Sequence, residues 1–250
     1  MSRIAFVITV SLLFIATVCS AQERGPETAE ETPTTNASLE ISEYHWDFGD
    51  VPKGVKVHHN FVLKNTGTDP LDIPKVRSSC GCSTAPLLKN RLEPGETTDL
   101  VLTFTTGNYR GKLQKTLTVL SSDPNNQQVK LTFAATVNDP DVKVEWKPRK
   151  VNFVQLYKGE KRKKTVELTN NTDSPLKLTL IEPPMADFLK LKLKKKTFEP
   201  GGSVEVEVEL TKKAPLGVFK KSFTIEVTGG ETHRLTIPIE GEIVSPPPKG

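Results

Sequence analysis

Two cysteines separated by one glycine are the residues of this chain best suited to chemistry. They lie in the motif Ser79-Cys80-Gly81-Cys82. In an extended segment Cys80 and Cys82 project to the same side, and Gly81 tolerates the bend that would bring the two sulfurs together. A disulfide that closes so small a ring would be strained, and strained, exposed disulfides are the easily reduced or catalytic ones. The motif therefore predicts an intramolecular disulfide across Gly81 and makes a thiol-redox role one candidate function.

Two other interpretations of the cysteine pair remain open. Two thiolates on one side of a loop could hold a soft metal ion such as Cu(I), with His58 or His59 as a third ligand. The pair could instead be a local clip that fixes the end of a loop. We favour the clip, because two cysteines without further spaced partners are a weak redox or metal signal. We expect no cofactor and no metal centre, since the histidines have no zinc-type spacing; they are His45, His58, His59 and His233.

A second group of residues could bind an anionic partner. The net charge is +4 and is concentrated in the second half of the chain, where basic residues form two clusters. The clusters are Lys161, Arg162, Lys163 and Lys164, and Lys190, Lys192, Lys194, Lys195 and Lys196. If they converge, they form a face for an anionic glycan or an acidic envelope protein. The alternative, which we favour, is a solvated strand face whose lysines prevent edge-to-edge pairing.

The first 21 residues are predicted to be a secretory signal peptide. Arg3 precedes the apolar run Ile4–Val18, and small residues follow at Cys19-Ser20-Ala21,. The run is short for a membrane span, which takes about 20 residues, so no transmembrane span is expected in the mature chain. Cleavage is expected between Ala21 and Gln22, with lipid attachment at Cys19 as the alternative. The protein should then be exported and periplasmic or associated with the cell envelope, where nucleic acid is not an expected partner.

The rest of the chain contains the same pattern twice. Asn65 and Asn170, Pro70 and Pro175, and Gly111 and Gly217 each stand about 105 residues apart,. The pattern predicts two domains, at residues 39–138 and 142–244. The segment 22–38, rich in Glu, Thr and Pro, is expected to be a disordered tether, and residues 245–250 a Pro-rich tail. At the same offset the motif is replaced by Pro184-Met185-Ala186-Asp187, so the cysteines should not be needed for the fold.

Alternation of apolar and polar residues predicts the fold class. Val57, His59, Phe61 and Leu63 alternate with polar residues with a period of two, which is typical of strands,. Further short strands follow, separated by turns. Neither copy contains the spacing of apolar residues that is typical of an amphipathic helix. This spacing favours an all-β protein made of two tandem immunoglobulin-like antiparallel sandwiches.

The first copy also resembles a known family. The resemblance covers residues 44–138 and rests on motifs that occur in the family's order: Asp47-Phe48-Gly49-Asp50-Val51, Lys53-Gly54, Asn65-Thr66-Gly67, Ser79-Cys80-Gly81-Cys82 and Glu93-Pro94-Gly95. The chain is similar there to a bacterial exported domain of unknown function marked by Ser-Cys-Gly-Cys. That family is related to abnormal-spindle and hydin-type immunoglobulin-like domains. The resemblance implies a fold and a compartment but no activity, and it is weaker over residues 142–244.

Three function classes follow. The first, and favoured, is a non-catalytic binding or structural protein of the cell envelope, because the chain has no recognisable catalytic motif. The second is a thiol-redox or metal-handling protein acting through Cys80 and Cys82. The third is a periplasmic assembly chaperone, which would suit two immunoglobulin-like domains but rests on analogy of fold alone. The oligomeric state does not follow from the sequence.

Overall fold

The computed structural model describes residues 35–140 and 142–247, which form strands and turns without a helix. The all-β class predicted from the sequence is confirmed. Because these residues contain no helix, none of them forms a helix that could cross a membrane. The predicted signal peptide, with Cys19 and the cleavage site at Ala21 and Gln22, lies outside the described residues.

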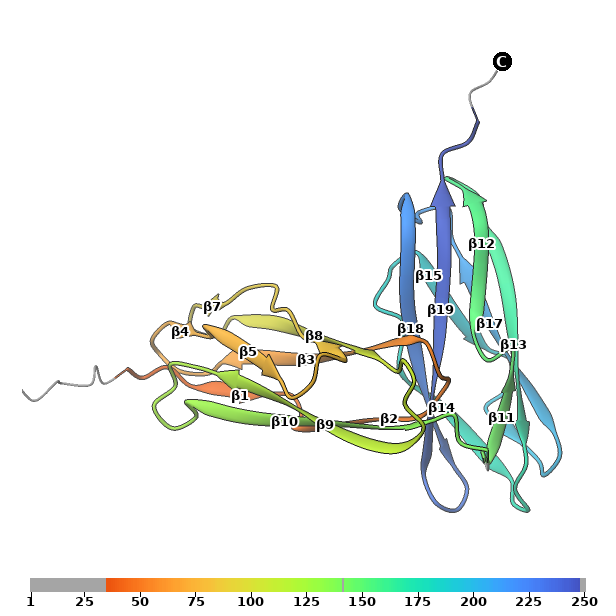
Figure 1. Ribbon diagram of the computed structural model, residues 1–250, viewed down its shortest axis with the longest axis horizontal. Helices are drawn as coiled ribbons and strands as arrows, with labels where there is room; N and C mark the ends of the chain where they lie inside the picture. Colours follow the sequence, from red (N-terminus) through yellow and green to blue (C-terminus); the bar gives the residue numbers. More distant parts are fainter. Residues whose placement is uncertain (1–34, 141, 248–250) are drawn as a thin grey trace, which may run out of the picture. The chain divides into compact units, whose positions relative to one another are not determined.

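The first sandwich is built from ten strands (Figure 1). They are β1 (Leu39–Ile41), β2 (His45–Val51), β3 (Lys56–Asn65), β4 (Leu71–Asp72), β5 (Lys75–Ser78), β6 (Ser83–Thr84), β7 (Arg91–Leu92), β8 (Thr97–Thr105), β9 (Gly111–Leu120) and β10 (Gln128–Val137). One sheet has the order β1-β3-β8-β6, and the facing sheet contains β2, β10, β9 and β5. Strands β4 and β7 form a separate pair.

The second sandwich repeats this arrangement with nine strands. They are β11 (Val144–Lys147), β12 (Val151–Tyr157), β13 (Arg162–Asn170), β14 (Leu176–Glu182), β15 (Leu189–Leu193), β16 (Thr197–Phe198), β17 (Ser203–Leu210), β18 (Gly217–Thr228) and β19 (His233–Val244). One sheet has the order β11-β13-β17-β15, and the facing sheet contains β16, β14, β18, β19 and β12. The predicted architecture of two tandem sandwiches is confirmed.

Each sandwich has its own core, which the alternation along the strands produces. On β3, Val57, Phe61 and Leu63 are fully buried while Lys56 and Lys64 are exposed. Four phenylalanines fill the first core: Phe48, Phe61, Phe104 and Phe133. The second core is built around Trp146, Phe153, Phe188, Phe219 and Phe223. Burying an aromatic side chain of this size is worth about 1.5–3 kcal/mol, so these residues dominate the stability of each sandwich.

Strands β2 and β19 connect the two sandwiches. Leu235 of β19 pairs in parallel with Asp50 of β2. This pairing joins the two sheets into one of nine strands, in the order β16-β14-β18-β19-β2-β10-β9-β5 with β12 beside β19. The described residues belong to one compact unit. The interface between the sandwiches is therefore part of the fold.

The last four residues of the predicted tether are ordered, which corrects the expectation that residues 22–38 are all disordered. Ala37 is buried, and the Asn36 N–H donates to the Asp69 carboxylate at 2.8 Å. The Ser38 carbonyl accepts from the Thr66 N–H at 2.9 Å. Composition alone missed this contact, because the segment is held by its backbone and by one small apolar side chain.

Candidate functional site

The cysteine pair lies where the chain crosses from one sheet of the first sandwich to the other. A disulfide joins Cys80 to Cys82, with their Cα atoms 5.2 Å apart. The pair follows β5, which pairs with β9, and precedes β6, which pairs with β8. Both cysteines are half-buried, and Cys82 packs against the first core. The disulfide thus lies in the bend of a crossover loop and not at the rim of a cleft.

Hydrogen bonds tie this loop to both sheets. On one side, the Ser79 N–H donates to the Thr116 carbonyl of β9 at 2.9 Å, and the Thr116 N–H donates to Ser79 Oγ at 3.1 Å. On the other side, the Thr105 N–H at the end of β8 donates to the Cys82 carbonyl at 2.8 Å. The loop therefore has little freedom to open around the disulfide.

The groups around the sulfurs are hydroxyls. Ser78 Oγ and Ser83 Oγ lie 2.5 Å apart, and Ser83 Oγ lies 3.7 Å from Cys80 Sγ. Ser78 Oγ also donates to the Cys80 carbonyl at 2.9 Å. A reactive thiolate is normally stabilised by a cation or a helix N-terminus. Within residues 35–140 and 142–247 there is no helix, and the side-chain hydrogen bond described for a sulfur is that of Cys80 with the uncharged Ser83.

The second sandwich shows what occupies the same position without cysteines. There the Thr211 N–H donates to the Phe188 carbonyl at 2.8 Å, as Thr105 does to Cys82. The strand register agrees, because Ser83 pairs with Phe104 and Leu189 pairs with Leu210. Cys82 therefore corresponds to Phe188, and Cys80 to Ala186. The sequence-based match to Pro184-Met185-Ala186-Asp187 was wrong by one residue, because the copies differ by one residue in length before this loop.

The matching residue in the second copy is a core aromatic. Phe188 is buried and packs edge to face on Phe219, with ring centroids 5.3 Å apart. In the first sandwich the residues that correspond to Phe188 and Phe219 are Cys82 and Leu113. Both are smaller than phenylalanine and are only partly buried against the core. The disulfide therefore stands where the twin domain has an aromatic pair. This position favours the interpretation of the cysteines as a structural clip.

The described part of the chain places no third metal ligand beside the cysteine pair. Among the residues that the structure describes, no three His, Cys, Asp or Glu side chains come together as a possible metal site. His58 Nδ1 is 3.0 Å from Thr103 Oγ1, and His59 Nδ1 is 2.8 Å from Glu182 Oε2. Both histidines are thus engaged in other contacts.

The basic clusters do converge, but carboxylates lie between them. Strand β17 separates β13 from β15 and presents Glu205, Glu207 and Glu209. Lys163 Nζ lies 2.7 Å from Glu207 Oε1, Lys161 Nζ lies 2.8 Å from Glu209 Oε1, and Lys194 pairs with Glu205. The hydrogen bond from Lys163 lowers the pKa of Glu207 and raises that of Lys163.

The remaining basic residues of the two clusters are less tightly paired. Lys190 and Lys192 lie opposite Glu209 and Glu207 in the strand register. Arg162 lies 3.7 Å from Glu160. Lys164, Lys195 and Lys196 have no ion pair within the described part of the chain. The face is therefore a ladder of alternating charge rather than a uniformly positive surface.

The sequence did not reveal the interface between the sandwiches. Trp46 and His59 stack with ring centroids 3.9 Å apart and planes 8° apart. His59 lies between two carboxylates, with Nδ1 2.8 Å from Glu182 Oε2 and Nε2 3.1 Å from Glu43 Oε1. His59 is almost fully buried, as expected for an inward position on β3, but its partner Glu182 comes from the other sandwich.

Two residues of β19 complete the interface. The Arg234 guanidinium carbon lies 4.8 Å from the centroid of the Trp46 ring, a cation–π arrangement,. The buried Thr236 Oγ1 donates to the Phe48 carbonyl at 2.7 Å. These contacts join residues that are about 190 positions apart,, and no local pattern predicts them.

Gly49, which belongs to the family motif of the first copy, allows the two sandwiches to approach each other closely at this interface. Its φ is +64°, and a Cβ added to it would lie 1.9 Å from the Arg234 carbonyl oxygen. No side chain fits between β2 and β19 at this point. The matching residue in the second copy is Val154, which is 69% exposed. The Phe-Gly motif of the first copy is therefore explained by the close approach of β19.

A polar cleft of about 830 Å³ lies beside the same interface. It is lined by Asp47, Asp50 and Asp139 together with Lys112, Arg234 and His233. Burial, together with the neighbouring Asp139 and Asp47 carboxylates, raises the pKa of Asp50 to about 6. The cleft is therefore lined by charges of both signs, and one of its carboxylates titrates near neutral pH.

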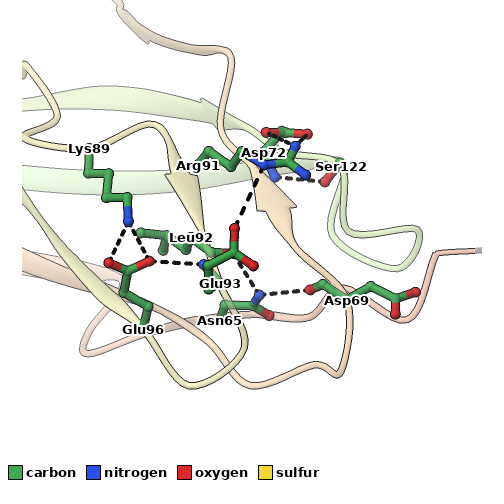
Figure 2. A network of polar contacts seen from close by, with 9 residues as sticks. All are labelled: Asn65, Asp69, Asp72, Lys89, Arg91, Leu92, Glu93, Glu96 and Ser122. Atoms are coloured by element: carbon green, nitrogen blue, oxygen red, sulfur yellow. Dashed lines mark hydrogen bonds and ion pairs between the residues drawn. The ribbon is translucent and has the colours of Figure 1, made fainter.

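At a turn of the first sandwich, a buried asparagine organises the backbone (Figure 2). Asn65 Nδ2 donates to the carbonyls of Asp69 and Leu92, at 2.8 and 3.0 Å. In the second sandwich, Asn170 Nδ2 donates the equivalent hydrogen bond to the Ser174 carbonyl at 2.8 Å. The repeated asparagines are thus turn-forming residues. Figure 2 also shows the exposed ion pairs around this turn, between Lys89 and Glu96 and between Arg91 and Asp72.

The fold and the crossover disulfide define a protein of two tandem immunoglobulin-like sandwiches, the first of which carries a disulfide between Cys80 and Cys82. Residues 39–137 match the family model described as "Protein of unknown function (DUF1573)". Residues 142–242 match the model described as "HYDIN/CFA65/VesB-like, Ig-like domain". The two matches cover one sandwich each, and they confirm the family resemblance predicted from the motifs.

Solved structures are similar to this chain only distantly. A protein of unknown function from Porphyromonas gingivalis W83 is 18% identical, with a TM-score of 0.36, and the match covers 82% of this chain and 99% of that chain. The YadV chaperone is 14% identical, with a TM-score of 0.33 and coverage of 80% and 98%. The PapD-like domain 7 of human CEP192 is 16% identical, with a TM-score of 0.35 and coverage of 43% and 89%.

A search of curated proteins finds no match.

Proposed function

We propose that this chain is a non-catalytic binding or structural protein of the cell envelope. The observation that carries the proposal is the equivalence of Cys82 with Phe188, a buried core aromatic of the twin domain. The cysteine pair was the strongest candidate for catalysis in the sequence. Its position at a crossover, tied by hydrogen bonds to both sheets, is that of a clip that replaces aromatic packing.

The proposed location rests on the N-terminal sequence. Arg3, the apolar run Ile4–Val18 and the small residues before Gln22 have the order of a secretory signal peptide,. A disulfide between Cys80 and Cys82 is also suited to an oxidising compartment,. As partner we propose an envelope protein rather than an anionic glycan, because glutamates on β17 neutralise much of the basic face.

The test compares the wild-type chain with the double variant Cys80→Ser/Cys82→Ser. A disulfide closing a loop of about 15 residues is worth about 3 kcal/mol, and a shorter loop is worth less. We expect a loss of up to about 3 kcal/mol in the free energy of unfolding in urea, with the β-sheet circular dichroism spectrum retained. In a glutathione-driven assay with insulin as substrate, wild type and variant should both show no turnover.

A second variant tests the equivalence with the twin domain. Cys80→Ala/Cys82→Phe recreates the residues found at Ala186 and Phe188, so it should be more stable than the double serine variant. Repeated turnover of insulin disulfides by the wild type but not by the serine variant would overturn the non-catalytic proposal. A Cys80→Ala/Cys82→Phe variant no more stable than the serine variant would overturn the clip as the role of the pair.

A further inference from the structure

A buried histidine at the interface between the sandwiches has a role that the proposed function does not explain. His59 of β3 is 2% exposed, and each nitrogen of its ring lies beside a carboxylate. Nδ1 is 2.8 Å from Glu182 Oε2, and Nε2 is 3.1 Å from Glu43 Oε1. Glu43 precedes β2 in the first sandwich, and Glu182 is the last residue of β14 in the second. The ring therefore bridges the two sandwiches.

A bulge in β14 places Glu182 at this position. The register of β14 with β18 shifts between Leu180 and Glu182, and a bulge changes the direction of the side chains around it. Ile181, which lies within this shift, packs against the core of the first sandwich. The second sandwich thus presents an apolar and a charged residue side by side to the first.

The protonation state of His59 decides how well it satisfies the two carboxylates. A neutral imidazole carries one N–H, so it can donate to only one carboxylate, and its other nitrogen turns a lone pair toward the second. An imidazolium carries an N–H on both nitrogens. Nε2 has no well-aligned hydrogen bond among the described residues, so its contact with Glu43 is electrostatic and depends on the charge of the ring. The protonated ring therefore joins the sandwiches more strongly than the neutral ring.

The neighbouring His58 stays neutral and also contacts the second sandwich. Burial, and after it the nearby Lys221 ammonium of β18, lowers the pKa of His58 to about 4. The backbone N–H of His58 donates to Ser222 Oγ of β18 at 2.9 Å. The charge of His58 therefore does not change near neutral pH, and its amide hydrogen is held by a bond that crosses the interface.

The nearest arginine is held by other partners. Trp46 covers one face of the His59 ring, with ring centroids 3.9 Å apart, and the Arg234 guanidinium carbon lies 4.8 Å from the centroid of Trp46. Arg234 also pairs with Glu226 at 3.2 Å. Strand β8 places the apolar Leu102 opposite His59. Among the described ion pairs, those of the His59 ring are the pairs with the two carboxylates.

We propose that His59 is a pH-dependent lock between the two sandwiches, in which the protonated ring joins Glu43 to Glu182 and loss of the proton loosens the interface. Glu43 is 36% exposed and can turn toward water when the ring is neutral, whereas Glu182 is 13% exposed and stays buried. Imidazole side chains change charge between about pH 5 and 8. By linkage, a proton that is bound more tightly in the docked state stabilises docking at low pH, and this contribution is lost as the pH rises through that range. The inference goes beyond the proposed function and does not depend on it.

The first measurement follows the proton. The imidazole resonance of His59 is assigned by its absence from the NMR spectrum of His59→Gln, and its chemical shift is followed as a function of pH in the full-length chain. In Glu182→Gln the titration midpoint should be at least about one pH unit lower than in the wild type, because an opposite charge at this distance favours the charged form. Glu226→Gln is the matched control, because it removes a carboxylate of the same sandwich that pairs with Arg234, and it should leave the midpoint unchanged. Equal midpoints in the wild type and Glu182→Gln would overturn the proposal.

The second measurement follows the interface. Hydrogen exchange of the His58 amide is compared between the wild type and Glu182→Gln at one pH at a time, so that the intrinsic pH dependence of exchange and the titration of Asp50 cancel. At about pH 5.5 the amide should exchange at least about tenfold faster in the variant, and at about pH 8 the ratio should fall below about threefold. The Thr105 amide, which donates to the Cys82 carbonyl within the first sandwich at 2.8 Å, is the internal control and should exchange equally in both proteins.

The outcomes separate a lock from a merely structural ion pair. A shifted midpoint with the same ratio of His58 exchange at both pH values would overturn the lock, and so would an equal acceleration of Thr105, because the effect would then not be confined to the interface. If circular dichroism shows that Glu182→Gln does not fold, Glu43→Gln decides the test with the same expectations. Failure of the lock leaves the disulfide clip untouched, and disulfide turnover by the cysteine pair would overturn the non-catalytic role without changing the titration of His59.

Discussion

Replacing Gly49 by Ala tests whether the close approach of β19 to β2 holds the two sandwiches together. The added Cβ would lie 1.9 Å from the Arg234 carbonyl oxygen and 2.3 Å from its carbonyl carbon. Both atoms belong to the backbone, so they cannot move aside as a flexible side chain could. The substitution should therefore push β19 away from β2 and break the contacts that follow it.

The magnitude has two parts. An L-residue in the left-handed region costs about 1–2 kcal/mol, and Gly49 has a φ of +64°. Displacing β19 also removes the buried hydrogen bond from Thr236 to the Phe48 carbonyl. A buried polar group left without a partner costs about 1–3 kcal/mol. With loss of the Arg234–Trp46 contact, which is worth about 0.5–1 kcal/mol or more, the total should be about 3–6 kcal/mol.

Gly54→Ala is the matched control. Gly54 has a φ of +74°, but nothing lies within 4 Å of the position where a Cβ would be added. This variant therefore carries the backbone cost of about 1–2 kcal/mol alone. Urea unfolding followed by circular dichroism measures both variants. Gly49→Ala should be less stable than Gly54→Ala by about 2–4 kcal/mol, the contribution of the lost contacts.

Small-angle X-ray scattering gives a second readout of the same change. The radius of gyration should increase in Gly49→Ala, because the sandwiches separate, and should be unchanged in Gly54→Ala. If the two variants lose the same stability and scatter alike, the interface does not hold the sandwiches together, and the structural reason given for Gly49 is wrong.

Three further predictions concern charge and processing. Burial raises the pKa of Asp50 in the folded state to about 6. The contribution of Asp50 to stability is therefore full at low pH and is lost as the pH rises through 6. Asp50→Asn should stabilise the chain at pH 7 by about 1–2 kcal/mol after solvent screening, and it should flatten the pH profile of urea unfolding between about 4 and 6. Replacing Glu207 and Glu209 by Gln should free the lysines paired with them and increase retention on a heparin column, an effect that disappears in high salt; unchanged retention would mean that these glutamates do not mask the face. Mass spectrometry of the exported protein should give a mature chain beginning at Gln22, and a chain beginning at Met1 or lipidated at Cys19 would contradict the predicted cleavage.

The strands and their inward residues were predictable because they depend on local alternation. On β3 each predicted inward residue is buried, since a period of two sends alternate side chains to opposite faces,. The repeated asparagine, Asn65 and Asn170, was visible for a related reason. It fixes a turn through bonds to residues close in sequence, such as the Asp69 and Ser174 carbonyls.

The candidate site was only partly predictable. The motif indicated a bond between Cys80 and Cys82. The two residues are two positions apart, so the local geometry of the chain can bring their sulfurs together. The equivalence of Cys82 with Phe188 required the hydrogen-bond register, since an offset counted along the sequence was one residue out at this loop. The charge ladder also needed the sheet order, because β17 lies between β13 and β15 in space but follows both in the chain.

The sequence by itself determined the class of fold, the duplication, the family resemblance and the cysteine pair, because each depends on residues near one another along the chain. Tertiary structure alone decided that β19 joins β2 and that Glu182 reaches His59 across the interface. The physical reason is that these contacts join residues more than about a hundred positions apart. Their formation depends on the packing of whole sheets, which no local periodicity encodes.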